Sequence, residues 1–263
     1  MKTALLISTY NWPEALELVL NSVEKQSVLP DEILIADDGS DNYTKEVIEK
    51  FVIRSKVPVL HIWQEDEGFR KAKILNKAVS RSTADYIIQI DGDVILHPYF
   101  IEDHKNRAEE NCYLYGSRVN ILPQAVARIL GGKLIGFHFF SSEIKNRSRT
   151  LHIPFFAKFY KKHKGISRKY RGCNTSYWKK DFMKINGYNE AFEGWGREDS
   201  DFAIRLGNAG VFAKRLKFAG IVFHIYHKVS SKGHVDKNNQ LQDNSIHQKM
   251  TRCEQGVHQY LNN

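Results

Sequence analysis

A regular alternation of strand and helix patterns over the first ninety residues constrains the fold most strongly. Four short runs rich in Leu, Ile and Val are separated by segments whose apolar residues recur at helical spacing. The expected strands are 3–8, 32–36, 57–63 and 86–90, and the expected helices are one that starts near Pro13, one around 47–51 and one over 71–80. Strands that alternate with helices predict an α/β fold with a mostly parallel, doubly wound sheet and helices on both faces.

Polar residues follow three of these four strands. They are residues 8–11, the pair Asp37 and Asp38, and the pair Asp91 and Asp93. In doubly wound sheets, ligands bind beyond the carboxyl ends of the strands. We therefore expect four carboxylates along one edge of the sheet, and with them the functional site.

Asp91 and Asp93 flank a single glycine after a strongly apolar run. Two carboxylates at this spacing on a turn can hold Mg²⁺ or Mn²⁺ and leave coordination positions for substrate phosphates. The alternative is an Asp-rich turn that only closes a strand. Asp38 can likewise accept hydrogen bonds from a ribose or a base, or else cap the following helix.

Residues 194–201, with the sequence Gly-Trp-Gly-Arg-Glu-Asp-Ser-Asp, form the most specific string in the chain. Glycines on either side of Trp195 permit tight turns, so the indole can pack against a ligand. The acids that follow lie where a helix is expected to begin, and they also complement a helix dipole. His224 and His227 follow an expected strand, and one imidazole can add a nitrogen ligand to a metal site.

Seven strings occur in order between residues 3 and 227, namely STYN, ADDGS, FRKAKILNKA, IDGD, RGCN, GWGREDSDF and HIYH. Together they resemble family 2 glycosyltransferases with a galactosyltransferase-type C-terminal segment, similar to bacterial chondroitin-polymerase domains. The resemblance implies the GT-A fold, a Rossmann-like, mostly parallel sheet. It also implies metal-dependent, inverting transfer of a hexose or N-acetylhexosamine from a UDP-sugar to a hydroxyl of a glycan or glycolipid, in bacterial surface polysaccharide or lipopolysaccharide synthesis.

The resemblance implies roles for individual residues. The nucleotide-sugar would contact Thr9, Tyr10, Asn11, Asp38, Arg70, Lys73, Asp91 and Gly92. The metal, Mn²⁺ or Mg²⁺, would be held by Asp93 with His224 or His227. The acceptor would lie against Gly194, Trp195 and Asn174. Asp199 would be the catalytic base, and Glu198 would hold hydroxyls of the donor or the acceptor.

We expect one catalytic domain over residues 1–230, with a nucleotide-sugar half at 1–120, a basic insertion at 123–171 and an acceptor half at 172–230. From 131 to 171 Phe and Tyr are interleaved with eleven Lys and Arg, and Glu143 is the only acid. This pattern predicts a solvated, flexible loop or a surface for anionic lipid, where each cation contributes about 1 kcal/mol. Residues 231–263 are expected to form a peripheral tail.

The spacing of the cysteines and the length of the apolar runs indicate where the protein is located. Cys112, Cys173 and Cys253 are widely spaced without a CxxC pair, which argues against a disulfide framework and fits a reducing compartment. No apolar run approaches the ~18 residues of a membrane span, and the apolar run that ends at Ile7 is too short for a signal segment. We expect a cytoplasmic protein in peripheral contact with the inner face of the membrane.

Three other functions fit the sequence less well. A basic nucleic-acid-binding protein with a Rossmann-like core would explain the net charge of +9, but the acidic clusters at strand ends and in residues 194–201 would repel phosphates in the absence of a metal. A dinucleotide oxidoreductase lacks its GxGxxG string after the first strand. A glycoside hydrolase with a carboxylate pair would leave the Asp-Gly-Asp turn without a role. We therefore expect no nucleic-acid partner.

Overall fold

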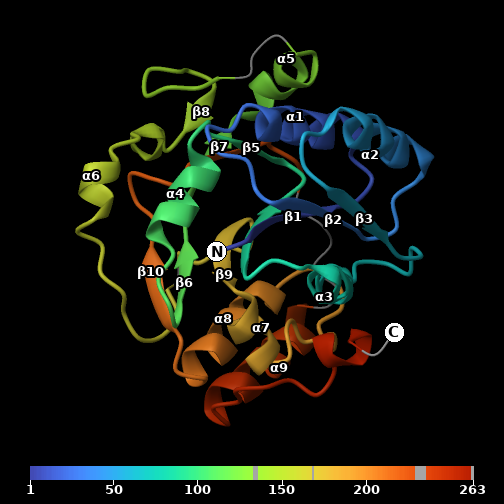
Figure 1. The fold of residues 1–263 in the computed structure, drawn as a ribbon, viewed down its shortest axis with the longest axis vertical. Coiled ribbons are helices and arrows are strands. Elements are labelled where there is room, and N and C mark those ends of the chain that lie inside the picture. Colours follow the sequence, from blue (N-terminus) through green and yellow to red (C-terminus); the bar gives the residue numbers. More distant parts are fainter. Residues whose placement is uncertain (133–135, 168, 229–234, 262–263) are drawn as a thin grey trace.

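A seven-stranded sheet forms the centre of the computed structural model, which describes all residues except 133–135, 168, 229–234 and 262–263 (Figure 1). The strand order is β10-β6-β9-β4-β1-β2-β3. The strands are β1 (Thr3–Thr9), β2 (Glu32–Asp37), β3 (Val59–Trp63), β4 (Tyr86–Asp91), β6 (Cys112–Tyr115), β9 (Asn174–Trp178) and β10 (Phe212–Arg215). β9 runs antiparallel to β4 and β6, and the other pairs of this sheet are parallel, which confirms the predicted α/β class.

Helices cover both faces of this sheet (Figure 1). One face carries α1 (Pro13–Glu24), α2 (Asn42–Arg54) and α4 (Phe100–Arg107), and the other carries α3 (Lys71–Arg81), α7 (Lys179–Lys184) and α8 (Glu198–Asn208). Side chains of β1 alternate between the two faces of the sheet. Leu5 and Ile7 pack against the face with α1, α2 and α4, and Ala4 and Leu6 pack against the face with α3, α7 and α8. Burial on both faces explains why the strands read as continuous apolar runs.

A second, four-stranded sheet, in the order β5-β11-β7-β8, lies beside the end of β4. Its strands are β5 (Val94–Leu96), β7 (Arg118–Ile121), β8 (Ile144–Lys145) and β11 (Val222–His224). β5 begins directly after the Asp-Gly-Asp turn, and in its antiparallel pairing with β11 Val94 lies opposite His224. This pairing brings two parts of the chain about 130 residues apart into one site.

The basic insertion is built from short elements rather than from one open loop. It contains η1 (Pro123–Ala125), α5 (Val126–Leu130), β8, η2 (Arg147–Thr150) and α6 (Pro154–Ala157). Ile129, Ile144 and Ala157 are buried and anchor these elements to the domain. Lys133 and Arg168, two of its cations, lie outside the described residues.

The C-terminal residues are part of the packed domain, which corrects the expectation of a peripheral tail. α9 (Val235–His247) packs against α8, and η3 (Val257–Tyr260) packs against α3. Cys253 and Val257 are buried, and Tyr260 donates a hydrogen bond to Glu190. Among the described residues, no helix has both the length and the apolar character of a membrane span.

Candidate active site

The ends of β1 and β4 meet at the centre of the site. Ser8 lies opposite Asp91 in the parallel register, and its hydroxyl donates to Asp91 Oδ1 over 2.8 Å. The Gly92 amide donates to the Ser8 carbonyl over 2.7 Å, and a Cβ at position 92 would lie 3.0 Å from Thr9 Oγ1. A residue larger than glycine would therefore press on Thr9. The predicted neighbours Thr9, Asp91 and Gly92 are brought together.

The Glu198–Asp199 pair enters the site from the first turn of α8. The turn before it is tight, since Gly194, Gly196 and Arg197 all have positive φ. Asp199 Oδ2 accepts the Gly172 amide over 3.1 Å, and a Cβ at position 172 would lie 2.2 Å from Asp199 Oδ1. Gly172 thus lets the carboxylate lie directly against the backbone.

Both acids of this pair resist ionisation. Burial, and then the charge of Asp199, raise the pKa of Glu198 to about 7. Burial also raises the pKa of Asp199, although Lys71, the Gly172 amide and Arg171 offset part of that effect. Within the described part of the chain, Glu198 Oε2 and Asp199 Oδ1 have no hydrogen-bond partner. Buried carboxyls with a raised pKa and one oxygen free of partners are typical of acid–base chemistry.

Lys71 is a central cation of the site, and the sequence reasoning missed it. Its ammonium lies 2.7 Å from Asp91 Oδ1. Burial opposes the charge, but the three carboxylates of Asp91, Asp199 and Glu198 raise the pKa of Lys71 well above its usual value. Burial also opposes ionisation of Asp91, but Lys71 and the Ser8 hydroxyl outweigh it and lower the pKa of that carboxyl. The FRKAKILNKA string contains Lys71, but the resemblance points to Arg70 and Lys73 within it.

A carboxylate and two imidazoles form a candidate metal centre beside the site. Asp93 Oδ2 lies 3.4 Å from His224 Nε2 and 3.1 Å from His227 Nε2. One ligand atom from each residue lies within 4.8 Å of the others. Burial lowers the pKa of His224, which keeps that imidazole neutral and able to ligate. The hydrogen bond with Asp93 raises the pKa of His227.

Residues predicted to contact the nucleotide lie at the ends of β1 and β2. Asp38 is buried; its Oδ1 accepts from Gln64 Nε2 over 2.6 Å and its Oδ2 from the Arg70 amide over 2.8 Å. Tyr10 is exposed, and its hydroxyl donates to Asp66 over 2.9 Å. The Asn11 side chain accepts from the Asp41 amide over 2.8 Å and so connects the two strand ends.

Arg70 and Lys73 have other neighbours than the central acids. The Arg70 guanidinium bonds Glu67 and donates to the Glu65 carbonyl over 2.8 Å. Arg70 and Lys73 together line a polar pocket of about 150 Å³, which they share with Glu190, Phe192, Glu193 and Gln255. The helix phase therefore turns Lys71, and not the two predicted cations, towards Asp91.

Two of the three residues predicted for the acceptor are accessible in this region. Trp195 is 41% exposed, and the Gly194 amide donates to the Phe69 carbonyl over 3.0 Å, which holds the loop beside α3. Asn174 is fully buried, and its amide donates to the carbonyls of Ser117 and Gly220. The prediction that Asn174 contacts the acceptor is therefore corrected: this side chain ties strands together.

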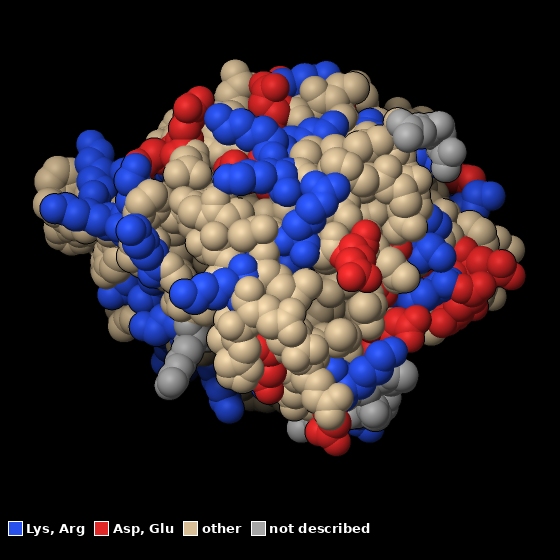
Figure 2. All heavy atoms as spheres, turned by 90° about the horizontal axis from the view of Figure 1, so that it is seen from below, with Lys and Arg blue, Asp and Glu red and all other residues tan. Residues whose placement is uncertain are grey.

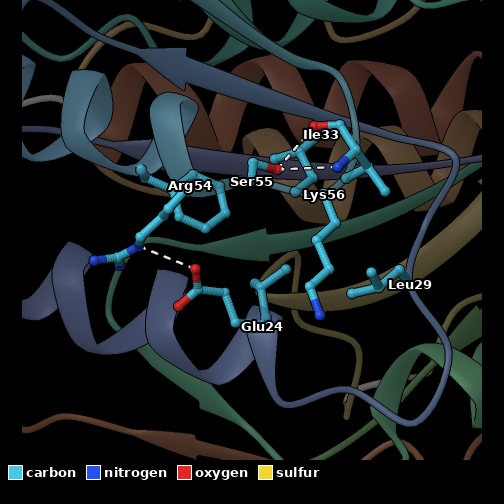
Figure 3. A pocket seen from close by; sticks show the side chains of 9 residues that line it. Glu24, Leu29, Ile33, Arg54, Ser55 and Lys56 are labelled. Atoms are coloured by element: carbon cyan, nitrogen blue, oxygen red, sulfur yellow. Dashed lines mark hydrogen bonds and ion pairs between the residues drawn. The ribbon is translucent and has the colours of Figure 1, made fainter.

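A separate cavity of about 240 Å³ lies at the opposite, amino end of the strands (Figure 3). It is lined mainly by apolar side chains between the ends of α1 and α2, and the ion pair of Glu24 with Arg54, 3.0 Å long, borders it. It holds none of the groups described above. The three cysteines are buried free thiols, as expected.

Curated relatives are glycosyltransferases longer than this chain. Validoxylamine A glucosyltransferase from Streptomyces hygroscopicus subsp. limoneus is 26% identical over 233 residues, which cover 79% of this chain and 48% of the relative. Hyaluronan synthase from Pasteurella multocida is 22% identical over 230 residues, which cover 81% of this chain and 23% of the relative. The chain thus spans half or less of the length of these two relatives.

Solved structures share the fold. Staphylococcus aureus TarS 1–349 in complex with UDP-GlcNAc matches with a TM-score of 0.65 and 16% identity over 99% of this chain and 69% of that one. The mannosyltransferase PcManGT from Pyrobaculum calidifontis, in complex with GDP-Man and Mn²⁺, matches with a TM-score of 0.61 and 15% identity over 94% of this chain and 63% of that one. These matches confirm the GT-A fold.

Two family profiles match the sequence. The profile described as glycosyl transferase family 2 matches residues 4–185, and the one described as the N-terminal domain of galactosyltransferase matches residues 154–228. None of these matches supports a nucleic-acid-binding protein. The chain belongs to glycosyl transferase family 2, as the order of its motifs predicted.

Proposed function

We propose that this chain is a metal-dependent, inverting glycosyltransferase that moves a hexose or N-acetylhexosamine from a UDP-sugar to a hydroxyl of a glycan or glycolipid. The observation that carries the proposal is the placement of Asp91, Lys71 and the Glu198–Asp199 pair in one charged group beside the Asp93 and histidine cluster. Nucleotide-sugar transfer needs two kinds of group. One binds the leaving diphosphate, and the other removes a proton from the acceptor.

The residues at the metal centre fit a divalent cation. Asp93 Oδ1 is buried without a hydrogen-bond partner among the described residues, and a cation would satisfy it. One carboxylate with two imidazoles suits Mn²⁺ better than Mg²⁺, which prefers oxygen ligands. When bound, the ion stabilises negative charge on the departing diphosphate. Asp93, His224 and His227 would hold it, with both histidines as candidate ligands.

The donor would lie between the nucleotide residues and Lys71. Asp38 and Thr9 would hold the base or the ribose, and Asp91 would accept from a hydroxyl of the ribose or the sugar. Lys71 keeps Asp91 ionised and adds positive charge beside the phosphates. The preformed hydrogen bonds of Ser8 and Gly92 support this role because they fix the turn before any ligand arrives.

The acceptor hydroxyl would lose its proton to Asp199. The Gly172 amide holds Oδ2, which leaves Oδ1 to accept the proton. Burial raises the pKa of Asp199 above its ordinary value, which makes the ionised carboxylate a stronger base. Glu198 would hold sugar hydroxyls, and Trp195 would pack against a sugar face of the acceptor. A single displacement from the opposite side of the sugar inverts the anomeric carbon.

The setting we propose is the synthesis of a bacterial surface polysaccharide or lipopolysaccharide. The similarity to hyaluronan synthase, chondroitin synthase and poly-beta-1,6-N-acetyl-D-glucosamine synthase supports a glycan product. The UDP-GlcNAc in the TarS complex supports a UDP-sugar donor.

The test is the release of UDP from a panel of UDP-sugars with Mn²⁺, repeated with EDTA. We expect one donor to be consumed, EDTA to abolish the reaction, and Asp93→Ala and Asp199→Asn to abolish it too. Asp199→Asn should still bind UDP, and Asp243→Asn, an exposed change on α9, should retain full activity. No turnover of any UDP-sugar by the wild type would contradict the proposal.

We also propose peripheral contact with an anionic membrane through α6 and the residues that follow it. Phe155 and Phe159 are 62% and 67% exposed, and Lys158 and Lys161 beside them are exposed. At the end of the molecule where α6 lies in Figure 1, Figure 2 shows mainly Lys and Arg among the charged side chains. Apolar rings flanked by lysines suit an anionic bilayer surface.

Vesicle flotation tests this contact. The wild type should float with phosphatidylcholine vesicles that contain phosphatidylglycerol and not with pure phosphatidylcholine. The Phe155→Ser/Phe159→Ser variant should lose flotation, whereas Tyr43→Ser/Ile53→Ser, a matched loss of exposed rings and apolar groups on α2, should not. Equal flotation of both variants would contradict the membrane contact.

A further inference from the structure

Four arginines gather at the same sheet edge as the catalytic acids, on the side away from the nucleotide residues. Arg215 ends β10, Arg118 begins β7 shortly after β6, and Arg171 precedes β9. Because β9 is antiparallel, the start of β9 lies at the carboxyl ends of β6 and β4. In the order β10-β6-β9-β4-β1-β2, these arginines therefore lie on one side of Asp91, and Thr9 and Asp38 lie on the other.

Hydrogen bonds join two of these arginines to the start of β7 and the residue before it. Arg149, from η2 of the basic insertion, donates from Nη1 to the Arg118 carbonyl over 2.8 Å. Arg215 Nη2 donates to the hydroxyl of Ser117, next to Arg118, over 3.3 Å. Partial burial, and then the charges of Arg215, Arg118 and Arg171, lower the pKa of Arg149. Four like charges near one another disfavour the free protein unless a counter-charge joins them.

Within the described residues, three of these four arginines have no acidic partner. Arg118, Arg149 and Arg215 form no ion pair there, whereas Arg128 of the same insertion pairs with Glu143. Arg215 Nε is buried and has no hydrogen-bond partner among those residues. A buried N–H without an acceptor is costly, and an anion would supply the acceptor. All four side chains remain partly or fully exposed, so a ligand can reach them.

The cluster adjoins the base. Gly172, whose amide holds Asp199, directly follows Arg171, and the charge of Arg171 acts on Asp199. On its other flank, the charge of Arg118 acts on His224 and His227. An anion on the cluster would thus lie next to the group that deprotonates the acceptor.

We propose that Arg118, Arg149, Arg171 and Arg215 form an anion subsite that binds a phosphate or carboxylate group carried by the acceptor. This inference rests on the proposed function, because it assigns the acceptor to the side of Asp199. Guanidinium groups bind both kinds of anion through paired, charge-assisted hydrogen bonds. The acceptor class it names is an acidic or phosphorylated glycan, and not a neutral sugar.

Calorimetry with two probes tests the subsite. Inorganic phosphate is titrated into the full chain saturated with UDP and Mn²⁺, and UDP is titrated separately with Mn²⁺ present. Arg149→Gln and Arg215→Gln should each weaken phosphate binding by about tenfold or more, because each removes a hydrogen bond to a charged group. Their affinity for UDP should stay within about twofold of the wild type, because the base and ribose would lie at Thr9 and Asp38, on the other side of Asp91, and the arginine whose charge acts on the two histidines is Arg118.

Arg128→Gln is the matched control, since Arg128 belongs to the same insertion but is paired with Glu143. It should bind phosphate like the wild type. Loss of UDP affinity by the same factor as phosphate affinity would assign the cluster to the donor diphosphate and overturn the proposal. Undetectable phosphate binding by the wild type, with UDP still bound, would also overturn it. Absence of UDP binding alone would instead refute the proposed function.

Discussion

Replacement of Glu198 by glutamine should stabilise the protein at alkaline pH while it impairs catalysis. The carboxyl is buried, and its Oε2 has no hydrogen-bond partner in the described structure. Burial and the charge of Asp199 raise its pKa from an ordinary 4.5 to about 7. The native state therefore favours the protonated acid, and ionisation of this group lowers stability.

The sign and size of the effect follow from linkage between protonation and folding. Below pH 4.5 the acid is protonated in both states and has no effect. As the pH rises from 4.5 through 7, the unfolded state loses its proton first, and the native state becomes progressively less stable. A difference of about 2.5 in pKa, at about 1.4 kcal/mol for each pH unit, amounts to ~3 kcal/mol above pH 7. Glu198→Gln should recover a gain of that order at pH 8 and little of it at pH 5.

Glu32→Gln is a matched control that should lower the stability of the protein instead of raising it. Glu32 is equally buried, but its oxygens accept from Ser82, Thr83 and Ala84 over 2.6–3.2 Å. Burial opposes ionisation there too, yet the hydrogen bonds from Ser82 and Thr83 outweigh it and lower the pKa of Glu32. Its glutamine variant should lose about 1–3 kcal/mol, because a charged acceptor with several donors is removed.

The assay is urea unfolding followed by tryptophan fluorescence and circular dichroism at pH 5 and pH 8, without UDP or metal. Coincident transitions by both probes would license the comparison. If Glu198→Gln is no more stable than the wild type at pH 8, or gains as much at pH 5, the assigned burial cost is wrong. A native residue that lowers stability in this way is expected where function selects it.

Three further predictions concern the catalytic base, the metal and the core. Gly172→Ala should lower kcat for UDP release by about 100-fold, because a Cβ 2.2 Å from Asp199 Oδ1 displaces the base; an unchanged rate would show that Asp199 needs no such contact. His224→Ala and His227→Ala should each weaken Mn²⁺ binding by about tenfold or more in a thermal-shift titration, and an unaffected variant would remove that histidine from the centre. Arg205→Met should lower the free energy of unfolding in urea by about 3–5 kcal/mol, because it leaves the fully buried Asp201 without its ion-pair partner at 2.7 Å. Adding Asp201→Asn should recover part of this loss, and no recovery would argue against the ion pair as the cause.

Periodicity predicted the central fold well because its signals are local. β1, β2, β3, β4 and α3 begin and end within about two residues of the expected bounds, since each carries its own apolar repeat. The edge rule for parallel sheets also predicted that Thr9, Asp38 and Asp91 would gather. These inferences needed no knowledge of how distant segments pack.

The C-terminal helix was missed because its buried face is polar. Asn238, Gln242 and Ser245 point into the domain at helical spacing, while the helix carries few apolar side chains. Ser245 donates to Asp201 over 2.6 Å, so hydrogen bonds replace apolar packing there. A hydrophobic pattern cannot reveal such a face.

The site details that were missed depend on helix phase and on close backbone approach. FRKAKILNKA offers several cations, and only the exact start of α3 decides that Lys71 lies against Asp91. Gly172 was not singled out because its importance lies in a carboxylate from α8 that packs against it. The arginine cluster depends on strand order, which periodicity does not give.

The loop that carries Trp195 is held from outside its own neighbourhood. Asn238 donates to the carbonyls of Glu193 and Gly196, each over 3.0 Å, from a position 42 residues beyond Gly196. During synthesis, therefore, the whole parallel sheet can form while this loop still lacks its support. The support for the Trp195 loop is synthesised after the sheet, and the acceptor surface proposed here is complete only when α9 has emerged from the ribosome.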